Sequence, residues 1–168
     1  ALLFLLVGRK GLAHPFQTCV RGIQGSLIPV VFISIVVGYG TAVQATPVFG
    51  WLVEQVLSLD MNPYLLTFVA VNLLAGMTAN GTGGVTLFME NFGATILGNP
   101  AINVGALHRI AAISGAGFDS LPHNGAIAFQ LSVFKLSYKD GYFQQFMMSV
   151  LVNLLAGLLA VLMAVVLF

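Results

Sequence analysis

Two long apolar segments of the sequence are each interrupted near their middle by a short run of glycines and polar residues. The first interruption reads AGMTANGTGG at residues 75–84, and the second reads GAGFDSLPHNG at residues 115–125. Glycine is a poor helix former, so a continuous helix is disfavoured at both places. A broken helix leaves backbone N–H and C=O groups without partners, and any fold of this chain has to provide partners for them.

The composition indicates the solvent in which these segments fold. Only 7% of the residues are charged and 58% are hydrophobic, with a mean hydropathy of +0.99, whereas a soluble domain carries roughly 25% charged residues. Such a chain cannot cover a water-facing surface, so we expect an all-α integral membrane protein. The net charge of +1 comes without a basic patch, so no nucleic-acid partner is expected. The single cysteine, Cys19, excludes an intrachain disulfide.

The lengths of the apolar runs predict a single membrane domain over residues 1–168. The run at 1–8 is too short to span a bilayer and lacks the pattern of a signal peptide. We therefore expect it to be the end of a helix, and the sequence to be the C-terminal part of a longer chain. Residues 11–22 are expected to form a polar connection. The other expected parts are a transmembrane helix at 23–43, an interfacial helix at 45–58, a re-entrant hairpin at 64–97, a broken transmembrane helix at 99–134 and a final transmembrane helix at 142–168.

The basic residues set the expected orientation. The first polar loop holds three of the six basic residues, and Lys135 and Lys139 follow the second broken segment. The positive-inside rule places both groups in the cytoplasm. A hairpin at 64–97 that enters and leaves on one face satisfies this placement, whereas a full crossing would put the lysines outside. One long helix broken in its middle, and small residues that only pack two helices closely, remain alternatives for this segment.

The two interruptions together indicate a transporter binding site. Non-helical backbone at membrane depth is tolerated only where it is buried in protein or lines a wet cavity. The N–H end of a half-helix attracts an anion such as a carboxylate, and the C=O end attracts a cation. Groups of both interruptions can then bind a substrate. The expected substrate-binding residues are Thr78, Asn80, Gly81, Thr82, Gly83, Ser120, His123 and Asn124.

Asp119 and His123 are the ionisable residues of the second interruption. An ionisable residue within a transmembrane segment is a functional hypothesis by default, because its charge is costly there. A low-dielectric site favours the protonated form of a carboxyl group, and histidine titrates near neutral pH. We therefore expect both residues to couple proton movement to substrate movement. The alternative is structural, with Asp119 capping the half-helix after the break and His123 held in a hydrogen bond.

Other polar residues carry weaker signals. Arg109 either contacts an anion or reaches toward the membrane interface, and His108 beside it is expected at that interface. Glu90 faces either the protein interior or the interface. No enzymatic or metal-binding motif is present, so no catalytic residue and no metal site are expected. An intramembrane hydrolase built on Asp119, Ser120 and His123 lacks the usual geometry of a triad; it remains an alternative, as does a purely structural membrane subunit.

The stretch GFDSLPHNGAI at residues 117–127 resembles the gluconate:proton symporter family, GntP. The preceding HRIA run, the MTANGTGGV stretch and the GYG run also resemble segments of that family, at residues 108–111, 77–85 and 38–40. Within the MTANGTGGV stretch, Asn80 and the Gly83-Gly84 pair depart from the family pattern. The resemblance covers nearly the whole chain, and the DSLPHNG motif is its most specific part.

This resemblance implies the ion-transporter superfamily fold, in which two inverted repeats each hold a re-entrant hairpin and a broken helix. The chain would then be the second repeat plus the final helix. The implied activity is alternating-access symport of a proton with gluconate, another sugar acid or 3-hydroxybutyrate, without a cofactor; sodium at the helix breaks is the alternative coupling ion. The implied partners are a small carboxylate, the lipid bilayer, the N-terminal repeat and, as one option, a second copy in a homodimer. The implied location is the bacterial inner membrane, with several crossings.

Overall fold

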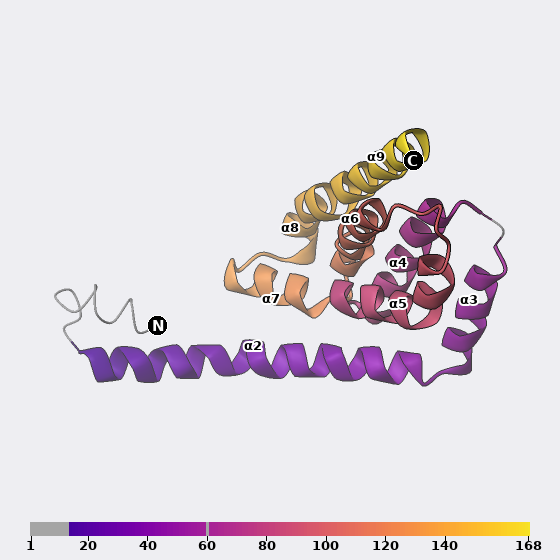
Figure 1. Ribbon diagram of the computed structural model, residues 1–168. Helices are drawn as coiled ribbons and strands as arrows, with labels where there is room; N and C mark the ends of the chain where they lie inside the picture. Colours follow the sequence, from indigo (N-terminus) through magenta and orange to yellow (C-terminus); the bar gives the residue numbers. More distant parts are fainter. Residues whose placement is uncertain (1–13, 60) are drawn as a thin grey trace.

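The computed structural model describes residues 14–59 and 61–168, and every secondary-structure element in these ranges is helical (Figure 1). The all-helical prediction is therefore confirmed for the described residues, and the expected helix end at 1–8 lies outside them. The helices are α2 (Pro15–Gln44), α3 (Pro47–Leu57), α4 (Pro63–Thr78), α5 (Gly81–Leu97), α6 (Val104–Gly115), α7 (Gly125–Val133), α8 (Tyr138–Gln145) and α9 (Val152–Leu167), with a 3₁₀ turn at Phe118–Ser120 and a π-helical turn at Phe146–Leu151.

Local sequence explains where most of these helices begin. Proline occupies the first turn of α2, α3 and α4, where its missing N–H has no intrahelical partner to lose. A polar residue before each of six helices accepts a hydrogen bond from a first-turn amide, which satisfies one of the free N–H groups. These capping residues are Thr46, Asn62, Asn80, Asn103, Asn124 and Ser137.

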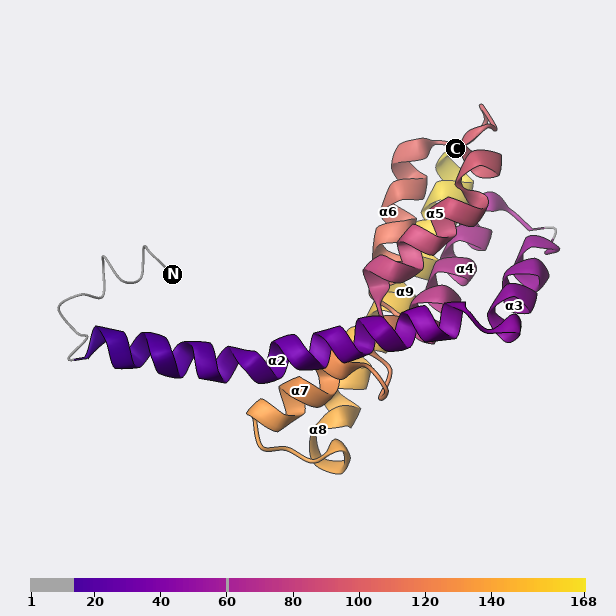
Figure 2. The same ribbon diagram turned by 90° about the horizontal axis from the view of Figure 1, so that it is seen from below.

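Helix α2 is a single helix of 30 residues that runs beside α4 and α7, and its N-terminal part extends past the other helices (Figures 1 and 2). The expected polar connection at 11–22 is wrong from Pro15 onward, because the helix already begins there. Proline at the first helical position starts this helix, and the polar residues after it remain within it. The segment expected as a transmembrane helix at 23–43 lies within the same helix.

The centre of the fold is the antiparallel pair α4 and α5, which covers the segment expected as a re-entrant hairpin. The two arms approach closely at Gly84, where an added Cβ atom would lie 2.6 Å from the backbone nitrogen of Ala75. Beside this contact the stacked rings of Phe88 and Phe92 are buried, with centroids 5.1 Å apart. Helix α6 packs on both arms and α9 packs on α4 and α6, so the hairpin is enclosed on one side by helices from later in the chain.

The C-terminal residues form one continuous helix, Tyr138–Leu167, that includes the π-helical turn. Among the described residues, this helix is the one identified as long and apolar enough to cross a membrane. It starts four residues before the expected position and contains a π turn, where an uninterrupted α-helix was expected over 142–168. The membrane placement of the other segments, including the re-entrant character of α4–α5, stays a prediction.

Candidate functional site

The two glycine-rich interruptions are in direct contact in the fold, through residue pairs that lie 45 and 47 positions apart in the sequence. Asn124 donates a hydrogen bond from Nδ2 to the carbonyl oxygen of Ala79, at 2.9 Å. His123 Nε2 lies 2.7 Å from the carbonyl oxygen of Gly76. Because a carbonyl oxygen only accepts, the imidazole donates this bond. The hairpin tip and the break between α6 and α7 therefore form one polar junction.

The hairpin tip is shaped by Ala79 and Asn80. Ala79 adopts a left-handed conformation with φ of 50°, which is uncommon for a residue with a side chain. Asn80 then caps α5, since its Oδ1 accepts from the Gly83 amide at 3.1 Å. The hydroxyl of Thr78 is buried and donates to the Leu74 carbonyl at 2.8 Å, within its own helix. Thr78 and Asn80 thus stabilise the tip, and Gly83 supplies the capped amide.

Asp119 meets the start of α5. Its Oδ1 accepts from the hydroxyl of Ser120 at 2.8 Å, and the backbone amide of Gly81 also donates to its carboxylate. The free N–H groups at a helix start favour a negative charge. The alternative in which Asp119 caps the half-helix after the break is wrong, because Asn124 fills that position: its Oδ1 accepts from the Ala126 amide at 2.6 Å. Asp119 instead accepts a hydrogen bond at the start of α5, the helix that follows the first interruption.

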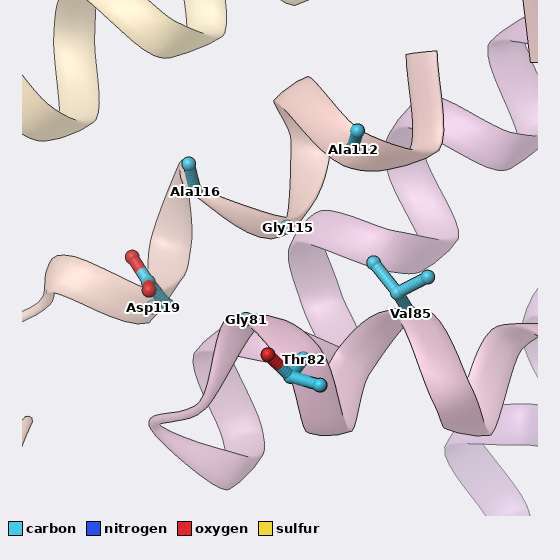
Figure 3. Close-up of a pocket in the computed structure, with 7 residues that line it drawn as sticks. All are labelled: Gly81, Thr82, Val85, Ala112, Gly115, Ala116 and Asp119. Atoms are coloured by element: carbon cyan, nitrogen blue, oxygen red, sulfur yellow. The ribbon is translucent and has the colours of Figure 1, made fainter. Parts of the chain in front are cut away.

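An open pocket of about 390 Å³ lies where α5, α6 and the break meet (Figure 3). Figure 3 shows the carboxylate of Asp119 and the side chain of Thr82 on either side of Gly81. These are the two polar side chains of the lining, which otherwise consists of small and apolar residues. The lining residues are Gly81, Thr82, Val85, Ala112, Gly115, Ala116 and Asp119.

A second pocket of about 230 Å³ shares Val85 and Ala112 with the first and continues it between α5 and α6. Its wall is apolar except for His108, which was expected at the membrane interface. The two pockets together form a groove whose polar end is at Asp119 and whose remaining length is apolar. A small molecule with a charged end and a hydrocarbon part fits this distribution of groups.

The structure brings the predicted site residues together and divides their tasks. Gly81, Thr82 and Asp119 line the pocket, His123 and Asn124 hold the junction, and Ser120 donates to the Asp119 carboxylate within the break. Glu90 and Arg109 are exposed and line neither pocket. Across residues 14–59 and 61–168, no group of three or more His, Cys, Asp or Glu side chains comes together that could hold a metal ion.

Sequence reasoning missed four residues of the site. Tyr138, Tyr142 and Asn153 donate to carbonyl oxygens of the second break. Asn72 is only 3% exposed, and its Oδ1 has no hydrogen-bond partner in the described structure. One signal pointed to Asn153, which is the strongly polar residue within the last apolar run. Tyr138 and Tyr142 have no local signature, because their partners are distant in the sequence.

The double role of Asn124 leads to a stability prediction. Asn124→Ala removes the cap of α7 and the bond to Ala79, while Asn124→Ser keeps a capping oxygen and loses only the amide donor. We expect the alanine variant to be destabilised by about 2 kcal/mol and the serine variant by about half as much. Thermal unfolding of the full-length protein in detergent measures both. Equal losses in the two variants would contradict a separate contribution from the cap.

Comparison with known proteins gives one partial match. The chain is 28% identical over 125 residues to a protein of Bacillus subtilis (strain 168) that is named uncharacterized transporter YxjC. The match covers 73% of this chain and 26% of that protein, so the chain spans about a quarter of the length of this relative. No family model matches the chain, and no solved structure matches it.

Proposed function

We propose that this chain is part of a secondary active transporter that carries small organic acid anions by alternating access. The observation that carries the proposal is the junction of the two interruptions, with a pocket at their contact. Interrupted helices that meet at a pocket are the arrangement in which transporters bind their substrates. The relative in Bacillus subtilis, which is named a transporter, supports the same class of function.

The geometry also supports coupling to protons through Asp119. Its carboxylate occupies the start of α5, which is where a substrate carboxylate would be attracted. Two carboxylates cannot share this place without strong repulsion. A proton on Asp119 removes that repulsion and releases the Gly81 amide for the substrate. Proton and anion would then bind together, which is the requirement for symport. Sodium at the break is the alternative coupling ion.

The pocket favours a short hydroxy acid over a sugar acid as the substrate. Gluconate carries a hydroxyl on most of its carbons, and each buried hydroxyl needs a hydrogen-bond partner. The pocket lining provides Thr82 and Asp119, and the groove beyond it is apolar. We infer that 3-hydroxybutyrate, with one hydroxyl and a short hydrocarbon part, matches these groups better.

The proposed setting is the bacterial inner membrane, with several crossings. The substrate-facing side of the groove would be completed by the N-terminal repeat of the same transporter, and a homodimer is the proposed assembly. These partners follow from the family resemblance, and the exposed apolar side chains of α2 and α9 support contact with lipid or protein on those helices.

Uptake by the full-length protein in proteoliposomes tests the function. We expect labelled 3-hydroxybutyrate to accumulate under an inward proton gradient, with gluconate taken up more slowly. Asp119→Asn is expected to lose at least about 90% of this uptake, because a proton-binding group in a transport site is not replaced by an amide. Asp140→Asn, at an exposed carboxylate on α8, is the matched control and is expected to keep the wild-type rate.

The same assay separates the alternatives. Uptake that follows a sodium gradient and ignores the proton gradient would overturn proton coupling and keep the transporter. Equal rates for the Asp119→Asn and wild-type proteins under a proton gradient would remove Asp119 from the mechanism. No uptake of either acid under either gradient would overturn transport of these substrates and favour a structural subunit.

A further inference from the structure

The break between α6 and α7 presents a row of backbone carbonyl groups to the C-terminal helix. Tyr138 donates from its hydroxyl to the Pro122 carbonyl at 2.9 Å. Tyr142 donates in the same way to the Ser120 carbonyl at 3.3 Å. Asn153 donates from Nδ2 to the Ala116 carbonyl, also at 3.3 Å. One helix therefore supplies side-chain partners along the length of the break.

The three donors follow the break in antiparallel order. The last donor in the sequence, Asn153, holds the first carbonyl of the break, and the first donor, Tyr138, holds the last one. Tyr138 and Tyr142 are one helical turn apart and lie on the same face, with ring centroids 5.9 Å apart. The π-helical turn Phe146–Leu151 lies between them and Asn153. Such turns interrupt regular helices mostly at functional sites.

The same helix is fixed to the hairpin arm. At Gly157 an added Cβ atom would lie 2.6 Å from a ring carbon of Phe68 on α4, so α9 and α4 are in close contact there. Val161 and Ala164, on the next turns of α9, are buried. The C-terminal helix therefore contacts both the hairpin that carries the first interruption and the backbone of the second one.

Asn153 holds the carbonyl of Ala116, which lines the pocket, and Tyr142 is the donor whose acceptor residue also binds the Asp119 side chain. The backbone carbonyl that it holds belongs to Ser120, whose hydroxyl donates to the Asp119 carboxylate at 2.8 Å. Asp119 in turn accepts from the Gly81 amide at the pocket wall. Ser120 therefore links two sets of hydrogen bonds, because its backbone is held by the C-terminal helix and its side chain holds the carboxylate at the start of α5.

We propose that Tyr142 is a positioning residue of the transport site, which places the Asp119 carboxylate against the start of α5 by holding the Ser120 carbonyl. The proposal rests on the function proposed above and adds a residue that contacts neither the pocket nor the substrate. Tyr138 supports the same turn from the Pro122 carbonyl, two residues further along.

Tyr142→Phe tests this proposal, because it removes only the hydroxyl group. We expect the KM for 3-hydroxybutyrate to rise about fivefold, the effect of one lost hydrogen bond, and the midpoint of the pH dependence of uptake to move, because Asp119 is no longer held in place. Tyr138→Phe is expected to change both quantities in the same direction by a smaller amount.

Tyr64→Phe is the matched control. Its hydroxyl oxygen accepts from the Asn103 amide at 2.9 Å, at the end of α6 that is remote from the break. This variant is expected to lower thermal stability while keeping the wild-type KM and pH midpoint. If Tyr142→Phe and Tyr138→Phe behave like Tyr64→Phe in both readouts, the positioning role is overturned. A wild-type protein that transports neither acid would overturn the proposed function itself, which is a separate result.

Discussion

Gly81→Ala is expected to abolish uptake and to destabilise the protein by about 3 kcal/mol, the upper part of the range for overpacking. An added Cβ atom at this position would lie 2.3 Å from the carbonyl oxygen of Gly115 and 3.1 Å from Oδ2 of Asp119. The first of these is a backbone atom at the end of α6, which cannot rotate away as a flexible side chain could. The starts of α5 and of the break would have to separate, and the bond between the Gly81 amide and Asp119 would be lost.

Gly50→Ala provides the control for this variant. Gly50 lies within α3, and an added Cβ atom there would have no neighbouring atom within 4 Å. Alanine is the better helix former, so this change is expected either to leave stability unchanged or to increase it by up to about 1 kcal/mol. Uptake and thermal unfolding in detergent measure both variants. Wild-type uptake by Gly81→Ala would show that the contact between the two interruptions is not needed for transport.

Gly117→Ala is expected to lower the stability of the protein strongly, and a second substitution is expected to restore most of that stability. An added Cβ atom at Gly117 would lie 2.1 Å from Oδ1 of Asn72, a buried side chain on α4. The resulting clash should cost about 1–3 kcal/mol. In the double variant with Asn72→Ala the obstructing atom is absent, so the added methyl group has space.

Thermal unfolding of the two single variants and the double variant forms a complete cycle. Asn72→Ala alone should have a mild effect, because its Oδ1 has no partner in the described structure and its Nδ2 donates to the Phe68 carbonyl of its own helix; the change also leaves a small cavity. We expect the double variant to be more stable than Gly117→Ala. Losses that simply add would contradict the direct contact between the two side chains.

The helices and both interruptions follow closely from local sequence, as the capping residues Asn80 and Asn124 illustrate. The error at the start of α2 has a local cause: Pro15 is compatible with a loop and with the first turn of a helix, and sequence alone does not distinguish the two. The partners across the site were not predictable. The structural alternative for Asp119 was a cap on α7, which follows it in the sequence, whereas its carboxylate accepts from the neighbouring Ser120 hydroxyl and from the Gly81 amide of α5.

The contact between the two sets of site residues was predictable, because polar groups in an apolar chain have few partners other than one another. The separate role of each residue within the site was not predictable. Thr78 and Thr82 are both threonines of one glycine-rich run, yet the first is buried in its own helix and the second lines the pocket. The left-handed residue Ala79 lies between α4 and α5 and turns the chain there. That turn decides which threonine faces which side.

The bonds from His123 and Asn124 to the carbonyl groups of Gly76 and Ala79 also bear on how the pocket is opened and closed. A hairpin tip that lifted by itself would break both bonds at once and take these partners from the buried carbonyl groups of Gly76 and Ala79, at a cost of about 1–3 kcal/mol for each carbonyl. The hairpin tip is therefore held to the break by these hydrogen bonds and does not open independently of it. In the proposed transporter, the hairpin tip and the break would therefore move together, and access to the pocket would depend on what covers the groove from outside.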